Sequence, residues 1–180
     1  MEARNLYFSY DEQPFIEGLE IKLQEGKITT ILGPNGSGKS TLLNLFANQY
    51  TPQSGSIYLG QRDIREMKGK EIAQKLAVVY QQNLAPSDLT VEKLVGYGRM
   101  PHKKLWQSIE ESDEEIIDWA LTVTNLTELR HKKLISLSGG ERQRAWIAMA
   151  LAQKTKILFL DEPTTYLDIY YQLEILELVK

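Results

Sequence analysis

The sequence has no cysteine among its 180 residues, so disulfide bonds and metal sites built from thiolates are excluded. No apolar run approaches the roughly 20 residues that a membrane-spanning helix needs. The net charge is only −3, from 21 basic and 24 acidic residues, and gives no general reason to expect nucleic acid or an anionic membrane as a partner. The polar start MEARN is unlike a secretory signal peptide. We therefore expect a soluble, cytoplasmic chain that meets a membrane only through a partner.

A glycine-rich segment carries the strongest motif in the chain. Residues 33–40 read GPNGSGKS, the full phosphate-binding pattern G-x-x-x-x-G-K-[ST], and they follow a strand-like apolar run at residues 28–32. Gly36 and Gly38 allow the backbone to curl so that consecutive N–H groups face a phosphate. The alternative is a glycine-rich turn that binds nothing, but the expected strand-then-helix context favours a nucleoside triphosphate site.

Each side chain of this loop has a role that the pattern predicts. Lys39 is expected to reach the β- and γ-phosphates, and Ser40 is expected to offer its hydroxyl to Mg²⁺. The helix that begins here directs the positive end of its dipole at the same charge. The residues assigned to nucleotide binding in this segment are Gly33, Pro34, Asn35, Gly36, Ser37, Gly38, Lys39, Ser40 and Thr41.

Two acidic residues follow a second apolar run, in KILFLDEP at residues 156–163. The four apolar residues from Ile157 to Leu160 predict a strand buried on both faces, as in a parallel sheet. Asp161 and Glu162 then emerge at its carboxyl end, where ligands bind in doubly wound sheets. We expect Asp161 to hold Mg²⁺ and Glu162 to polarise an attacking water. A solvated acidic pair that simply leaves a strand is the alternative.

The segment LSGGERQ at residues 137–143 has two compatible interpretations. Ser138 and Glu141 have the spacing of a capping box, which predicts a helix to about Gln153. The same helix start, with two glycines and a hydroxyl, is a second anion site. Here the chain resembles the ATP-binding subunits of ABC transporters, whose LSGGQ signature it matches except for Glu141. That resemblance implies that Ser138, Gly139 and Gly140 act in trans, in a head-to-tail homodimer with two ATP molecules.

Further segments match the same family in order. Tyr10, in LYFSY, corresponds to the aromatic residue that stacks on adenine, although an ordinary strand aromatic is the alternative. Gln81, after the apolar run Leu76–Val79, corresponds to the glutamine that contacts Mg²⁺ and the attacking water, with Gln82 as an adjacent competitor. Asp168, in TTYLD, corresponds to the loop that crosses to the other subunit.

The fold class that follows is α/β, a P-loop NTPase core with a mainly parallel sheet. An antiparallel β subdomain is expected at the N-terminus, with a strand at residues 55–59. We expect one ABC ATPase domain over residues 1–180, in which 1–82 and 134–180 form the core and 83–133 an inserted helical subdomain.

Two helices are expected in the inserted helical subdomain. Thr90 is expected to cap a helix through Tyr97, and Ser112 with Glu115 is expected to form a capping box. The apolar face of the second helix would contain Ile116, Ile117, Ala120 and Leu121.

The stretch VGYGRMPHKKLW at residues 95–106, together with TTYLD, is similar to the ATPases of importers for iron–siderophore complexes, haem and cobalamin. This resemblance implies ATP and Mg²⁺ as cofactors. It also implies membrane permease subunits as partners at the inner face of the membrane and no direct contact with the metal chelate. The basic residues of the stretch form either a docking surface for an acidic partner loop or a solvated loop: Arg99, His102, Lys103 and Lys104.

The end of the sequence departs from the family pattern. The chain ends within a helical-looking run at residues 170–179, and no histidine follows Asp168, whereas family members carry a switch histidine further downstream. We therefore expect a C-terminally truncated ABC ATPase fold. Two other functions stay open: a soluble ABC ATPase outside transport, and a nucleotide-binding module without turnover.

Overall fold

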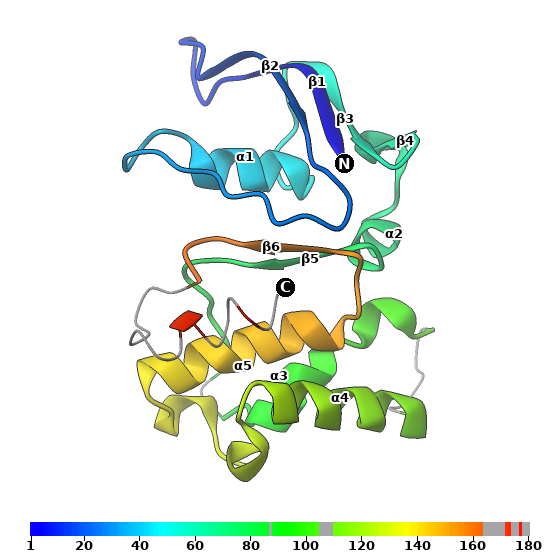
Figure 1. The fold of residues 1–180 in the computed structure, drawn as a ribbon, viewed down its shortest axis with the longest axis vertical. Helices are drawn as coiled ribbons and strands as arrows, with labels where there is room; N and C mark the ends of the chain where they lie inside the picture. The colour runs from blue at the N-terminus through cyan, green and yellow to red at the C-terminus, as the bar shows by residue number, and fades with distance from the viewer. Residues whose placement is uncertain (87, 105–109, 164–171, 174–176, 178–180) are drawn as a thin grey trace. The chain divides into compact units, whose positions relative to one another are not determined.

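The computed structural model describes residues 1–86, 88–104, 110–163, 172–173 and 177 (Figure 1). The chain divides into two compact units, Met1–Ile72 and Ala73–Lys180, which are described separately. Among the described residues, no helix combines the length and the apolar character needed to cross a membrane.

The first unit contains a four-stranded antiparallel sheet in the order β2-β1-β3-β4. Its strands are β1 (Glu2–Phe8), β2 (Ile16–Lys22), β3 (Ser54–Leu59) and β4 (Arg62–Asp63). Ala3, Leu6 and Phe8 of the central strand β1 are buried, and β1 pairs with β2 on one side and β3 on the other. The expected antiparallel subdomain and the strand at residues 55–59 are therefore confirmed.

Helix α1 (Lys39–Phe46) begins directly after the phosphate loop and buries Leu42, Leu45 and Phe46, an apolar stripe with helical spacing. Two short helices follow near the end of the first unit: η1 (Ile64–Glu66) and α2 (Gly69–Ala73). The strand expected at residues 28–32 is wrong, because these residues have no regular structure, and Ile28 and Leu32 are 60% and 87% exposed. A strand exists only where a neighbour pairs with it, and no described strand of this unit does so.

The second unit contains a pair of parallel strands, β5 (Leu76–Val79) and β6 (Ile157–Leu160), with Leu76 opposite Ile157 and Val79 opposite Leu160. Both strands lie where the sequence predicts them. The expectation that β6 is buried on both faces is wrong, because Phe159 alone is buried and the other three residues are half-buried. Among the described strands, β6 has one neighbour, β5.

The second unit also contains three helices: α3 (Val91–Tyr97), α4 (Glu111–Val123) and α5 (Gly139–Ala152). Helix α5 lies between the strands and the other two helices (Figure 1) and contacts both β5 and the α3–α4 pair. Ile147 and Ala150 pack with Ala77 and Val79 of β5, while Ala145, Ala148 and Ala152 belong to the helical core. Short helices connect these elements: η2 (Met100–His102), η3 (Thr127–Leu129) and η4 (Leu134–Ser136).

The two helix starts in this region test the capping predictions. Thr90 caps α3 by accepting a hydrogen bond from the Lys93 amide, as expected. The capping box expected at Ser112 and Glu115 is wrong, because α4 begins at Glu111 and its box consists of Glu110 and Asp113. Asp113 also has buried basic partners, which the local pattern alone cannot reveal. The predicted apolar face of α4 is confirmed, since Ile117, Ala120 and Leu121 are buried and Ile116 packs against them.

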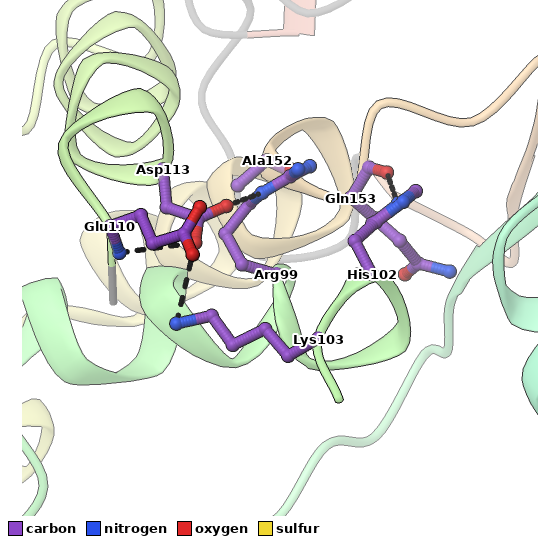
Figure 2. A network of polar contacts seen from close by, with 7 residues as sticks. All are labelled: Arg99, His102, Lys103, Glu110, Asp113, Ala152 and Gln153. Carbon is purple, nitrogen blue, oxygen red and sulfur yellow. Dashed lines mark hydrogen bonds and ion pairs between the residues drawn. The ribbon is translucent and has the colours of Figure 1, made fainter. Parts of the chain in front are cut away.

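Arg99 and Lys103 of the basic stretch at residues 99–104 form a largely buried network of ion pairs with Asp113 (Figure 2). For these two residues, the expectations of a docking surface and of a solvated loop are therefore both wrong. Arg99 is 8% exposed; its Nε donates to Asp113 Oδ1 over 2.8 Å and its Nη1 donates to the Ala152 carbonyl over 2.8 Å. Lys103 Nζ lies 3.3 Å from Asp113 Oδ2. His102 Nε2 lies 2.7 Å from the Gln153 carbonyl oxygen, at the end of α5.

The charge of Asp113 depends on this network. Burial by itself raises the pKa of Asp113, but hydrogen bonds from Arg99, the Glu110 amide and Lys103 outweigh it and leave the pKa below its ordinary value. A carboxyl whose pKa is lowered by folding stabilises the native state above its unfolded pKa, about 3.9. That contribution is lost as the pH falls through the folded pKa.

Replacing Arg99 should therefore be costly. We expect Arg99→Ala to lower the free energy of unfolding at pH 7 by about 2 to 4 kcal/mol, because Asp113 loses a buried partner. Arg62→Ala is the matched control: Arg62 pairs with Glu71 at 3.5 Å, both side chains are at least 42% exposed, and its loss should cost under about 1 kcal/mol. Urea unfolding measures both values, and equal losses in the two variants would contradict a structural role for the network.

Candidate nucleotide site

The phosphate loop adopts the curled backbone that its glycines predict. Gly36 and Gly38 have φ values of 81° and 93°, in the left-handed region, and Gly38 is the residue that precedes α1. Lys39 Nζ donates to the carbonyl oxygens of Gly33 and Pro34, each over 3.0 Å, so its side chain folds back along the loop. The ammonium group and the N-terminus of α1 therefore present positive charge on the same short segment.

Tyr10, the predicted adenine-stacking residue, lies beside this loop in the same unit. Its hydroxyl lies 2.7 Å from Thr41 Oγ1, and its ring is within 5.0 to 5.9 Å of three other rings, those of Phe8, Phe15 and Tyr50. We call these four residues the aromatic cluster. Phe15 also lies against Gly38, where an added Cβ would come within 2.9 Å of the ring. The structure therefore brings Tyr10 and the phosphate loop together.

The acidic pair follows β6 as the sequence predicts. Asp161 is 7% exposed, and its amide donates to the Val79 carbonyl over 2.9 Å, which extends the pairing of β5 and β6 by one residue. Glu162 has a φ of 48°, a left-handed conformation that is strained for a residue with a side chain. Such strain is common where a side chain has to be aimed at a functional site.

The side chain of Glu162 meets the predicted glutamine. Gln81 Nε2 donates to Glu162 Oε2 over 2.6 Å, across 81 residues of sequence. Both residues come from the carboxyl ends of the parallel strands β5 and β6, where side chains of neighbouring strands converge. Gln81, rather than its neighbour Gln82, is the residue that makes this bond.

The donor set assigned to magnesium consists of oxygen ligands, which suit this ion. Ser40 offers a hydroxyl, Asp161 a carboxylate and Gln81 an amide carbonyl. Within the described residues there is no group of three or more acidic or histidine side chains that could hold a metal alone. Mg²⁺ usually takes one or two protein ligands and completes its shell with phosphate oxygens and water.

The signature segment forms the capping box that its sequence predicts. Ser138 Oγ accepts the Glu141 amide over 3.2 Å, and the Ser138 amide donates to Glu141 Oε2 over 2.7 Å. That amide is the largest cause holding the pKa of Glu141 below its ordinary value. Ser138 and Gly139 are exposed and Gly140 is half-buried, so this helix start faces solvent. Asp168, the remaining residue expected to act in trans, lies outside the described residues.

Two contacts of the site have no signal in the sequence. The hydrogen bond between Tyr10 and Thr41 joins residues 31 positions apart, and no spacing rule pairs them. Phe15 follows a proline in a polar hairpin and looks like an unremarkable loop residue until the structure places it against Gly38.

A curled phosphate loop before a helix, with an acidic pair directly after a strand of a parallel pair, defines a nucleotide-binding protein of the P-loop class. The family model described as ABC transporter matches residues 16–165, and this chain belongs to that family. The resemblance seen in the sequence is thereby confirmed.

Among curated relatives, the petrobactin import ATP-binding protein FpuC of Bacillus anthracis is 46% identical over all of this chain and 66% of its own length. The iron(3+)-hydroxamate import ATP-binding protein FhuC of Bacillus subtilis is also 46% identical, over 99% of this chain and 66% of its own length. The chain thus spans just under two thirds of these relatives.

Solved structures give the same fold. An inward-facing, putative metal-chelate type ABC transporter aligns with a TM-score of 0.83 and 34% identity, over 99% of this chain and 65% of that one. A bacterial ABC transporter cassette solved as a dimer aligns with a TM-score of 0.84 and 27% identity, over 99% of this chain and 80% of that one. The expected P-loop core of an ABC ATPase is confirmed.

The capping box at Ser138 makes a prediction about stability. We expect Ser138→Ala to lower the free energy of unfolding by about 1 kcal/mol, because the Glu141 amide loses its acceptor. Ser112→Ala is the control, since the Ser112 hydroxyl has no hydrogen bond among the described residues and its loss should cost under about 0.5 kcal/mol. Urea unfolding at pH 7 compares them, and a Ser138→Ala protein as stable as the control would show that the cap contributes nothing.

Proposed function

We propose that this chain is the ATP-binding and ATP-hydrolysing subunit of an ABC importer, for an iron–siderophore complex or a related metal chelate. The observation that carries the proposal is the hydrogen bond between Gln81 and Glu162, at the carboxyl ends of two parallel strands. A carboxylate there, directly after a buried aspartate, has the chemistry required to activate a water molecule. The phosphate loop would bind the phosphates of the nucleotide, and Tyr10 beside it would bind the base.

The mechanism follows from these side chains. Lys39 and the amides of the loop bind the β- and γ-phosphates. Ser40, Gln81 and Asp161 would hold Mg²⁺, which would neutralise charge on the phosphate oxygens. Glu162 orients a water molecule and accepts its proton while the water attacks the γ-phosphorus in line, the bond to the leaving ADP oxygen breaks, and inorganic phosphate is released. Gln81, by donating to Glu162, fixes the direction of that carboxylate.

A second copy of the chain would complete the γ-phosphate shell. The exposed N-terminus of α5 offers the Ser138 hydroxyl and the backbone amides of Gly139 and Gly140, which suit an anion brought by a partner. In a head-to-tail homodimer these groups act in trans together with Asp168, and ATP binding closes the dimer. The dimeric cassette among the structural neighbours supports this arrangement.

The transport role rests on the relatives, whose names describe import ATP-binding proteins for petrobactin and iron(3+)-hydroxamate. We propose that dimer closure drives membrane permease subunits, that the chain works on the cytoplasmic side of the membrane, and that it never contacts the metal chelate or nucleic acid. Co-purification with a permease pair would separate this function from that of a soluble ABC ATPase outside transport. Binding of ATP without turnover would identify a nucleotide-binding module instead.

Glu162→Gln tests the catalytic part of the proposal. The amide cannot accept the proton of the attacking water, so Mg-ATP hydrolysis should slow by roughly 10²- to 10⁴-fold. ATP affinity should stay within about two-fold of the parent protein, because the change affects the transition state more than the bound nucleotide. Steady-state phosphate release and equilibrium titration measure the two quantities, and undiminished turnover would remove Glu162 from this role.

Lys39→Ala is the complementary variant, because it removes the ammonium group that we expect to bind the phosphates. It should weaken equilibrium binding of Mg-ATP, whereas Glu162→Gln should not. An unchanged ATP affinity in Lys39→Ala would contradict the assignment of residues 33–41 as the phosphate site.

A further inference from the structure

Tyr10 and Thr41 are joined at their hydroxyl groups, and this bond links two parts of the first unit. The two oxygens are 2.7 Å apart. Thr41 belongs to the phosphate loop and the first turn of α1 and is 6% exposed, whereas Tyr10 lies just beyond β1 and is 56% exposed. The tip of the tyrosine is thus tied to the phosphate-binding helix while much of the ring stays accessible.

Three rings hold Tyr10 from its sides. Phe8, Phe15 and Tyr50 meet it in edge-to-face orientations, with interplanar angles of 83°, 65° and 83°. Phe15 in turn lies against Gly38, at the N-terminus of α1. The hydroxyl bond and the ring contacts therefore fix the plane of Tyr10 relative to the same helix that carries the phosphate loop.

We propose that the hydrogen bond between Tyr10 and Thr41 is a positioning contact that couples recognition of the base to recognition of the phosphates. A ring held in place loses little conformational entropy when a base stacks on it, so preorganisation increases affinity for ligands that carry a base. A ligand gains affinity from both Tyr10 and the phosphate loop only if the distance between its base and its phosphates matches the distance between Tyr10 and the loop. This inference rests on the proposed function, because it assumes that an adenine nucleotide binds at this loop.

A purely structural role makes a different prediction. A buried hydroxyl such as that of Thr41 needs a hydrogen-bond partner, and Tyr10 satisfies that need with or without a ligand. In that case removal of the Tyr10 hydroxyl affects all ligands of the loop alike. The informative quantity is therefore a ratio, the Kd for inorganic triphosphate divided by the Kd for ATP, both measured with Mg²⁺. We call it the base advantage.

Tyr10→Phe keeps the ring and removes only the hydroxyl. We expect the base advantage to fall by about three- to ten-fold, the loss of one hydrogen bond, while the Kd for inorganic triphosphate stays within two-fold. Tyr50→Phe is the matched control, because Tyr50 belongs to the same aromatic cluster and its hydroxyl has no hydrogen bond among the described residues. Its base advantage should equal that of the parent protein.

Variants of Thr41 test the other partner. Thr41→Val should lower the base advantage as Tyr10→Phe does, Thr41→Ser should retain it because a hydroxyl remains, and the double variant Tyr10→Phe/Thr41→Val should lose no more than either single variant. Taking the ratio cancels any direct effect of residue 41 on the phosphates. Far-ultraviolet circular dichroism and urea unfolding confirm that each variant is folded.

The outcomes separate this inference from the proposed function. An unchanged base advantage in Tyr10→Phe, or losses that multiply in the double variant, would overturn the coupling while leaving ATP binding intact. A parent protein that binds ATP and inorganic triphosphate equally well would do the same. A parent protein that binds neither would overturn the proposed function and the coupling with it.

Discussion

Burial of α5 on two faces is the constraint on which the second unit depends. One face packs against β5 and the other against α3 and α4, so the helix joins the strand pair to the helical core. Hydrogen bonds hold its C-terminal end at two points. Arg99 donates to the Ala152 carbonyl, and the Gln153 side chain donates to the carbonyls of Ala73, the last residue of α2, and Leu76, the first residue of β5. The N-terminal end of α5 carries Ser138, and the far end of β5 leads to Gln81. Helix α5 thus packs directly on the strand that leads to Gln81 and itself begins at Ser138.

In the first unit, a hydrogen bond between the hydroxyl groups of Tyr10 and Thr41 connects the aromatic cluster to the phosphate loop. The loop itself is held by local chemistry, namely glycines with positive φ and a lysine that folds back on backbone carbonyls. Tyr10 and Phe15 then contact the loop from the hairpin between β1 and β2. Local backbone geometry thus shapes the phosphate loop, and contacts distant in sequence place the aromatic ring of Tyr10 beside it.

The sequence predicts what local chemistry determines and misses what pairing and burial decide. The capping box at Ser138, the cap at Thr90 and the strands β5 and β6 depend on neighbours within a few residues or on continuous apolar runs, and all lie where expected. The strand expected at residues 28–32 depends on a pairing partner that the pattern does not contain. In the sequence Arg99 and Asp113 look like charged surface residues. In the structure they form a buried ion pair with each other. Of the candidate site, the sequence predicts the residues, whereas the bonds from Tyr10 to Thr41 and from Gln81 to Glu162 require the fold.

The most direct test of the account is the Mg-ATP hydrolysis rate per chain over a wide range of protein concentration, with bound nucleotide measured in the same samples. Because the proposed γ-phosphate shell includes the N-terminus of α5 from a second copy, we expect ATP to bind to the single chain and specific activity to rise with protein concentration. A specific activity independent of concentration would contradict action in trans by Ser138, and the absence of bound ATP at any concentration would contradict the nucleotide site itself.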